Sequence, residues 1–289
     1  MNTKYTLSLA AASVTALVAG AVVADGHGKA VADEVIAQQR AALAAATAGA
    51  GFGPQAPRDI DSAEGSNPRV YESAPHYTDM NLCNIHFHEG AEHRGGEFTT
   101  YAGNGDGKGH GTGFLYSGKL SEGERKPLAK PVGMGEKHRG LNAGDTIEVH
   151  YVHTTAQVTP GPTLGACLSD AIMNPQLRVE TQVYVLVNDS TALDFTELAA
   201  VGEVNGYYQA LNIPNDTGTP VQYDGSTTGP SYNEAGSPFQ VSWSVRPKVA
   251  KVDIASVGKW LDDNRFDEKY AHAVRNLVIN PDLLSQINP

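Results

Sequence analysis

Residues 146–153, Thr-Ile-Glu-Val-His-Tyr-Val-His, alternate in side-chain type with a period of two. On a β-strand, Glu148, His150 and Val152 therefore point to one face, and the residues between them point to the other face. Val, Ile and Tyr are also enriched in strands. The stretch predicts a β-strand that presents a histidine and a carboxylate side by side.

A second stretch, residues 84–88 (Asn-Ile-His-Phe-His), alternates in the same way. His86 and His88 would leave the same face of a strand with Cα atoms about 6.6–6.8 Å apart. Taken alone, this pair also fits two surface histidines. If the two strands are neighbours, His150 completes a set of three imidazoles, which can hold Zn²⁺ tetrahedrally and leave a fourth position for water. Such a water has a pKa of about 7.

The segment between residues 81 and 254 consists of short strand patterns separated by glycine-rich connections. Residues 178–187 are rich in Val and Tyr, and residues 239–245 alternate again. This pattern predicts a mainly β domain with a central antiparallel sheet. The connections over 103–145 and 212–238 are long, and loops of that length are uncommon unless they carry function or disorder.

Helical patterns flank this β region. Residues 29–48 are alanine-rich and end at a glycine-rich stretch, so we expect a peripheral helix there. Residues 255–280 carry apolar side chains at three- to five-residue steps, which predicts a C-terminal helix ended by Pro281. The expected fold is mainly β with peripheral N- and C-terminal helices.

The composition and the N-terminal residues indicate which binding partners and which cellular compartment to expect. The 289 residues carry 21 basic and 32 acidic side chains, a net charge of −11, so a nucleic-acid partner is not expected. Lys4 precedes an apolar run over residues 6–23, which predicts a signal peptide cut after Ala24. The alternative for this run is a membrane anchor. We expect an exported protein, periplasmic or extracellular, with no stable membrane span after signal removal.

The predicted organisation has four parts: a signal peptide over 1–24, a helical extension and linker over 25–58, a catalytic domain over 59–254, and a helical tail over 255–289. The only two cysteines, Cys83 and Cys167, favour a single disulfide in an exported protein. Two buried free thiols are the alternative. The oligomeric state is left open.

Three blocks of this sequence resemble a known family. Residues 86–93 (His-Phe-His-Glu-Gly-Ala-Glu-His) are similar to the zinc-ligand block of α-type carbonic anhydrases, and residues 147–153 to their Glu-Leu-His-Leu-Val-His strand. Residues 225–230 (Gly-Ser-Thr-Thr-Gly-Pro) resemble the family's threonine loop, and 241–245 the strand after it. The condensed first block is closest to the δ class, and the resemblance runs from about residue 81 to 250.

The resemblance implies a zinc-dependent enzyme that interconverts CO₂ and bicarbonate by attack of metal-bound hydroxide. His86, His88 and His150 would be the zinc ligands, with Co²⁺ or Cd²⁺ as substitutes. Thr227 would accept a hydrogen bond from the hydroxide and orient it, and Glu92 would receive the Thr227 proton.

Further residues are assigned from the same resemblance. Glu148 would accept the outer N–H of His150, and Val152 and Trp243 would line the pocket for CO₂. His93 and His153 match family positions that are structural.

The chain also departs from the family. Glu89 replaces a tryptophan, the leucine before the orienting threonine is missing, and the cysteines fall elsewhere. No proton shuttle is assigned; His76 and His110 are candidates in loop-like sequence.

Two other functions fit parts of the pattern. His86, His88 and Glu92 match the first half of a cupin ligand set, which would hold iron or manganese as readily as zinc. However, the expected cupin glycines would fall at Met80 and Thr99. The second alternative is a carbonic-anhydrase-like binding protein without turnover, although such proteins usually lack a ligand histidine.

Overall fold

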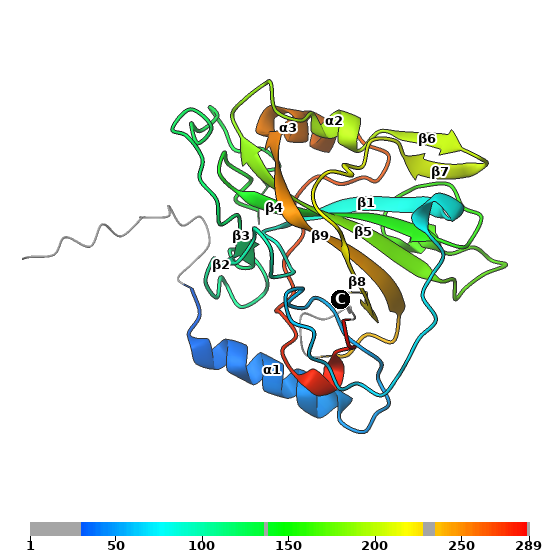
Figure 1. The fold of residues 1–289 in the computed structure, drawn as a ribbon. Helices are drawn as coiled ribbons and strands as arrows, with labels where there is room; N and C mark the ends of the chain where they lie inside the picture. The colour runs from blue at the N-terminus through cyan, green and yellow to red at the C-terminus, as the bar shows by residue number, and fades with distance from the viewer. Residues whose placement is uncertain (1–29, 136–137, 228–234, 288–289) are drawn as a thin grey trace, which may run out of the picture.

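A five-stranded sheet runs through the centre of the computed structural model, which describes residues 30–135, 138–227 and 235–287 (Figure 1). The predicted signal peptide and positions 228–230 of the threonine loop lie outside these residues. The strands follow the order β1-β4-β5-β9-β8. Their bounds are β1 Asn81–Glu89, β4 Thr146–Thr154, β5 Leu177–Val187, β8 Val221–Ser226 and β9 Gln240–Asp253.

The sheet is mixed, whereas the sequence predicted an antiparallel one. Three of the four strand pairings are antiparallel, but β5 and β9 run parallel. Between them the chain forms α2 (Phe195–Leu198), the hairpin β6–β7 (Val201–Val204 and Tyr207–Ala210) and β8. Since this crossover brings β9 back in at the end where β5 began, the two strands share a direction.

One face of the sheet packs against α2 and α3 (Ile254–Asp262) (Figure 1). Phe87 of β1 and Tyr151 of β4 belong to a buried apolar cluster that also holds Phe195 of α2 and Trp260 of α3. The rings of Phe87 and Phe195 lie 5.6 Å apart, edge to face, an arrangement that stabilises aromatic pairs. From Ile85 onward, the odd-numbered apolar residues of β1, together with Ile147, Val149 and Tyr151 of β4, therefore form part of this apolar cluster.

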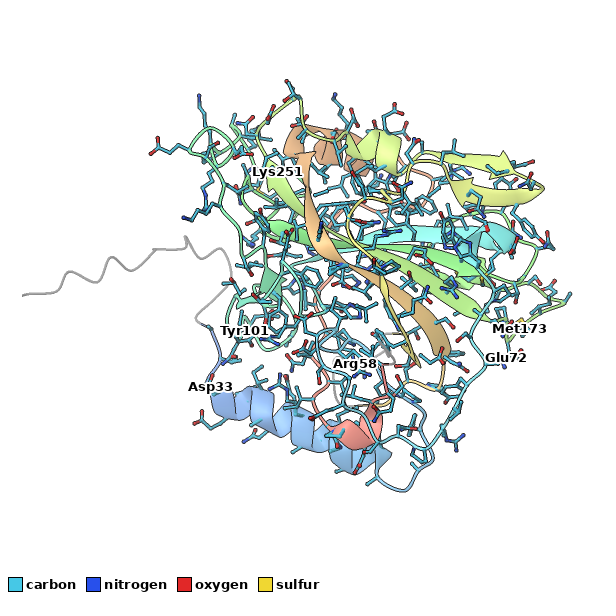
Figure 2. All side chains as sticks on the ribbon, viewed as in Figure 1. Asp33, Arg58, Glu72, Tyr101, Met173 and Lys251 are labelled. Carbon is cyan, nitrogen blue, oxygen red and sulfur yellow. A yellow bond between two sulfur atoms is a disulfide. The ribbon has the colours of Figure 1, made fainter. Side chains whose placement is uncertain are left out.

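The opposite face carries the even-numbered residues of β1 and β4 and is covered by loops and by α1 (Asp33–Thr47). The helix predicted over 29–48 is thus confirmed. Leu43 of α1 forms a small apolar cluster with Val278, Leu283 and Leu284. Figure 2 shows side chains filling the layer between the sheet and α1, where the fully buried Arg58 is labelled.

The C-terminal helix predicted over 255–280 is wrong beyond Asp262. Asn264 competes with the helix, because its side-chain amide donates to the carbonyls of Trp260 and Glu268 and its oxygen accepts from two backbone N–H groups. The chain then runs extended along the edge of β1. Residues 268–276 are called the C-terminal strap below.

Backbone hydrogen bonds attach the strap to its neighbours. The N–H of His272 donates to Phe87 at 2.8 Å, and the carbonyl of His272 accepts from Glu89 at 3.0 Å. On the other side, the N–H of Val274 donates to Gly109 at 2.8 Å. The strap therefore lies between β1 and the glycine-rich loop over 103–113.

Short elements complete the fold. The long connection over 103–145 contains β3 (Phe114–Leu115), which pairs with β2 (Thr100–Tyr101). Single 3₁₀ turns form at η1 (Tyr77–Asp79), η2 (Leu164–Cys167) and η3 (Pro281–Leu283). No helix among residues 30–135, 138–227 and 235–287 combines the length and apolar character needed to cross a membrane.

The predicted disulfide between Cys83 and Cys167 is confirmed, with Cα atoms 5.0 Å apart. Cys83 sits where the β1–β4 register shifts, between Leu82 and Asn84. The bond therefore ties the start of β1 to η2, three residues before His86.

Candidate metal centre

The pairing of β1 with β4 brings the predicted ligands together. His86 lies directly opposite His150, and His88 lies opposite Glu148. Because alternate residues of a strand share a face, all four side chains project to the same side of the sheet. The two strands are neighbours, as the hypothesis of three histidine ligands required.

The geometry of the three rings suits a tetrahedral ion. The ring centroids of His86, His88 and His150 lie 4.8–5.4 Å apart. Nε2 of His86 is 3.3 Å from Nδ1 of His150. Two Zn–N bonds of about 2.0–2.1 Å at a tetrahedral angle place their nitrogens about 3.3–3.4 Å apart, so this spacing matches a shared zinc ion.

Each ring is held through its outer nitrogen. Nδ1 of His86 donates to Asn84 Oδ1 at 2.6 Å, and Nδ1 of His88 donates to the carbonyl of Ala273 at 2.8 Å. Nε2 of His150 donates to Glu148 Oε1 at 2.7 Å. Such contacts fix the tautomer and leave the inner nitrogen as a lone pair for a metal.

The inner nitrogen of His88 makes the strongest case for an ion. Nε2 of His88 is buried and has no hydrogen-bond partner among the described residues. A buried polar atom without a partner costs free energy unless something satisfies it. A metal held jointly with His86 and His150 would satisfy it, so these residues fit a zinc ion.

Electrostatics keep the imidazoles neutral. Burial lowers the pKa of His88 to about 4, with the nearby His272 as the second cause. Burial also lowers the pKa values of His86 and His150. Neutral imidazoles are the form that binds a metal, so little proton release is needed at neutral pH.

Glu148 is the centre of a buried network. Burial by itself would raise the pKa of Glu148, but the electrostatic interaction with His93 and hydrogen bonds from His150 and His93 hold it well below its ordinary value. His93 donates to Glu148 through Nδ1 at 2.7 Å and accepts from the hydroxyl of Tyr223 at 2.6 Å. Arg58 lies over the Tyr223 ring. The carboxylate is thus oriented from two sides.

Glu92 and Thr227 are both buried but have separate partners. Glu92 Oε1 accepts from the backbone N–H of Arg275 at 2.7 Å and lies 3.5 Å from Nδ1 of His88. The hydroxyl of Thr227 lies 3.2 Å from that of Ser237. Within the part of the chain that the structure describes, no hydrogen bond joins Thr227 to Glu92. Burial raises the pKa of the Glu92 carboxyl.

The two predicted CO₂-pocket residues belong to one apolar cluster. Val152 and Trp243 are 2% and 3% exposed and share this cluster with Val179 and Val241. The Trp243 ring lies edge-on to His150 with centroids 5.1 Å apart. An apolar wall therefore lies beside His150, the predicted ligand of β4.

The remaining sequence-predicted residues lie around this centre. Glu89 is 7% exposed and forms an ion pair with Arg139, which balances the charge that replaces the family's tryptophan. His153 is buried and bonds the carbonyl of Tyr151. His76 caps η1 and contacts Thr78, whereas His110 lies in the glycine-rich loop, edge-on to His138.

Sequence reasoning missed the strap. His272, Ala273 and Arg275 all reach the site, but two of them act through backbone atoms, which leave no trace in the residue pattern. Asn84 was also missed, although it lies two residues before His86, on the same face of the strand, and so could have been found. Three groups of described residues have metal-binding spacing: His86 with His88 and His272, His88 with Glu92 and His150, and His93 with Glu148 and His150. The three predicted ligands are spread over these groups and do not form one of them.

Comparison with known proteins finds a family model that matches more than half of the chain. The family model described as "Delta carbonic anhydrase" matches residues 77–256. Among solved structures, the Photobacterium profundum alpha-carbonic anhydrase is 17% identical, covering 78% of this chain and 86% of its own with a TM-score of 0.27. An alpha-carbonic anhydrase from Thermovibrio ammonificans, solved with the inhibitor sulfanilamide, is 14% identical, covering 76% and 83% with a TM-score of 0.25. No curated protein sequence matches.

Proposed function

Since the chain belongs to the delta carbonic anhydrase family, we propose that it is a zinc-dependent carbonate dehydratase that interconverts CO₂ and bicarbonate. The observation that carries this proposal is that three imidazoles lie together on one face of the sheet. Nε2 of His86 is 3.3 Å from Nδ1 of His150, and Nε2 of His88 is buried without a hydrogen-bond partner among the described residues. His86, His88 and His150 would hold the ion. Co²⁺ and Cd²⁺ are expected to occupy the same ligands.

When bound, zinc would supply the Lewis acidity that makes hydroxide available near neutral pH. The chain's own groups would do the rest. Glu148 accepts the outer N–H of His150 and thereby directs the Nδ1 lone pair inward. The carbonyl of Ala273 does the same for His88.

Thr227 is proposed to orient the attacking oxygen toward CO₂ through its hydroxyl, and Glu92 to accept the proton of that hydroxyl. The family motif supports both roles, and so does the burial of both side chains. Val152 and Trp243 would form the apolar wall against which CO₂ lies.

The position of Glu92 favours this proposal over a cupin centre. Glu92 approaches His88 from the Nδ1 side, and that nitrogen already donates to Ala273. The nitrogen without a partner is Nε2. A carboxylate on the outer side of the ring is placed to orient a ligand rather than to share the metal with Nε2.

We further propose the organisation and compartment inferred from the sequence. The catalytic domain would span 59–254, preceded by a signal peptide over 1–24 and the extension over 25–58, and followed by the tail over 255–289. The disulfide supports export to the periplasm or the extracellular space, because such bonds persist in oxidising compartments.

The decisive experiment is stopped-flow CO₂ hydration by the mature protein, before and after zinc is stripped and restored. We expect turnover that disappears on chelation and returns with zinc. A protein that holds one zinc without turnover would instead be a binding protein, and iron in place of zinc would restore the cupin alternative.

A further inference from the structure

We propose that His272 is a positioning residue that holds the ring of the metal ligand His86 in its binding orientation. The inference rests on the proposed function, because it assigns His86 to the metal. His272 lies outside residues 77–256, the part of the chain that the family model matches. It belongs instead to the C-terminal strap.

The contact between the two rings is a stack. The imidazole planes of His272 and His86 are 16° apart with centroids separated by 5.0 Å. The same His272 ring stands edge-on to His88, with centroids 5.6 Å apart and planes at 80°. One side chain of the strap therefore touches two of the three proposed ligands.

His272 is itself held from two directions. Its backbone N–H donates to Phe87 and its carbonyl accepts from Glu89, the residues on either side of His88. Its Nε2 lies 2.7 Å from Oε2 of Glu268. Although the side chain is 44% exposed, these contacts fix where its ring can lie.

The outer contact of His86 holds its ring less firmly than that of His150. Its outer nitrogen bonds Asn84, a neutral side chain of its own strand, whereas His150 bonds a buried carboxylate. A flat ring stacked on His86 restricts rotation of the imidazole out of the plane that directs Nε2 to the ion. Restricting unproductive orientations of a ligand before binding strengthens metal binding.

The test compares His272→Ala with His272→Phe in the full chain. The readouts are the zinc dissociation constant, measured by competition with a chromophoric chelator, and the visible spectrum of the Co²⁺ form. His272→Ala should weaken zinc binding about three- to tenfold and alter the Co²⁺ spectrum, because the stack is lost. His272→Phe keeps a flat ring and should stay within about twofold of the wild type.

Tyr270→Ala is the matched control. Tyr270 lies in the same strap, is 39% exposed, and stacks on His138 with planes 8° apart and centroids separated by 4.2 Å. His138 is not a proposed ligand. Removing this ring should leave the zinc dissociation constant within about twofold of the wild type, because the lost stack is of the same kind but does not touch a ligand.

Two results would overturn the positioning role. These are wild-type zinc affinity and spectrum in His272→Ala, or equal losses in His272→Phe and His272→Ala. Because neither readout needs turnover, a wild-type chain that binds zinc but does not hydrate CO₂ would refute the proposed activity alone. A wild-type chain that takes up no zinc would refute both proposals.

Discussion

His86 and His150 lie directly opposite each other across the β1–β4 pair, with Nε2 of one 3.3 Å from Nδ1 of the other. Strand register and the outer hydrogen bonds of the two rings shape this spacing. A site that is already shaped for its metal loses little conformational entropy when the metal binds. We therefore expect the affinity to depend on each of the contacts that shape it.

Replacing His150 by Ala should lower zinc affinity by more than about 100-fold, which exceeds the 10- to 100-fold cost of losing an outer contact. The variant also removes the imidazole of His150, which is proposed to share the metal with Nε2 of His88. Zinc content after dialysis against a weak chelator measures the effect. His76→Ala, which removes an exposed histidine of η1, should retain the metal; equal zinc contents in both variants would contradict the assignment.

Thr227→Ala should keep the metal and lower kcat for CO₂ hydration about 100-fold, because an orienting hydrogen bond is removed and no ligand is touched. Thr227→Ser, which retains the hydroxyl, should recover most of the rate. Stopped-flow assays on zinc-quantified samples separate the two effects. Full activity in Thr227→Ala would show that Thr227 does not orient the attacking oxygen.

Glu148→Gln should weaken zinc binding about 10- to 100-fold, since the neutral amide no longer stabilises the Nε2–H tautomer of His150. The substitution keeps the shape of the side chain, so the protein should remain folded. Chelator competition gives the dissociation constant, and circular dichroism checks the fold. Unchanged affinity would mean that His93 and Tyr223 can orient the site without the charge.

The metal-free protein should lose stability as the pH falls. His88 has a pKa of about 4 in the folded chain against 6.5 ordinarily, so the unfolded chain takes up its proton first. As the pH falls from 6.5 to about 4, His88 alone should lower the free energy of unfolding by up to about 3 kcal/mol. Above pH 6.5 this group should contribute no change.

Urea titrations in the presence of a chelator measure this slope. In His88→Phe the slope should be smaller, because the titrating group is gone while the contribution of other buried histidines such as His153 remains. An identical slope in the two proteins would show that His88 is not protected from protons in the folded state.

Replacing both cysteines by Ala should lower the free energy of unfolding by about 2–4 kcal/mol, because the bond between Cys83 and Cys167 closes a long loop in the unfolded chain. The sequence separation is 84 residues. Urea denaturation of oxidised wild type and variant measures the difference. Equal stabilities would mean that the bond restrains the unfolded chain little.

The alternation of β1 and β4 was sufficient to predict which histidines share a face, because a period of two fixes side-chain direction. It was not sufficient to predict strand direction, since parallel and antiparallel strands alternate identically. The expected antiparallel sheet therefore did not include the parallel pairing of β5 with β9. The C-terminal helix failed for a local reason. The apolar spacing of Phe266 and Tyr270 fits a helix. However, the side chain of Asn264 donates to the backbone carbonyls of Trp260 and Glu268, four residues before and four residues after it, and this ends the helix.

The contribution of the strap was beyond the reach of sequence reasoning. Ala273 acts through its carbonyl and Arg275 through its N–H, and any residue except proline supplies both groups. His272 is visible as a histidine, but only the path of the strap along β1 shows that it touches His86.

The hydrogen bond between His88 and Ala273 joins residues 185 positions apart. A chain leaves the ribosome in sequence order, so all three proposed ligands are translated long before Ala273. A nascent chain thus offers a loose histidine triplet without the carbonyl that fixes one tautomer. The centre with the carbonyl of Ala273 in place can form only after residue 273 has been made, so binding of the proposed metal at this complete site would follow that point.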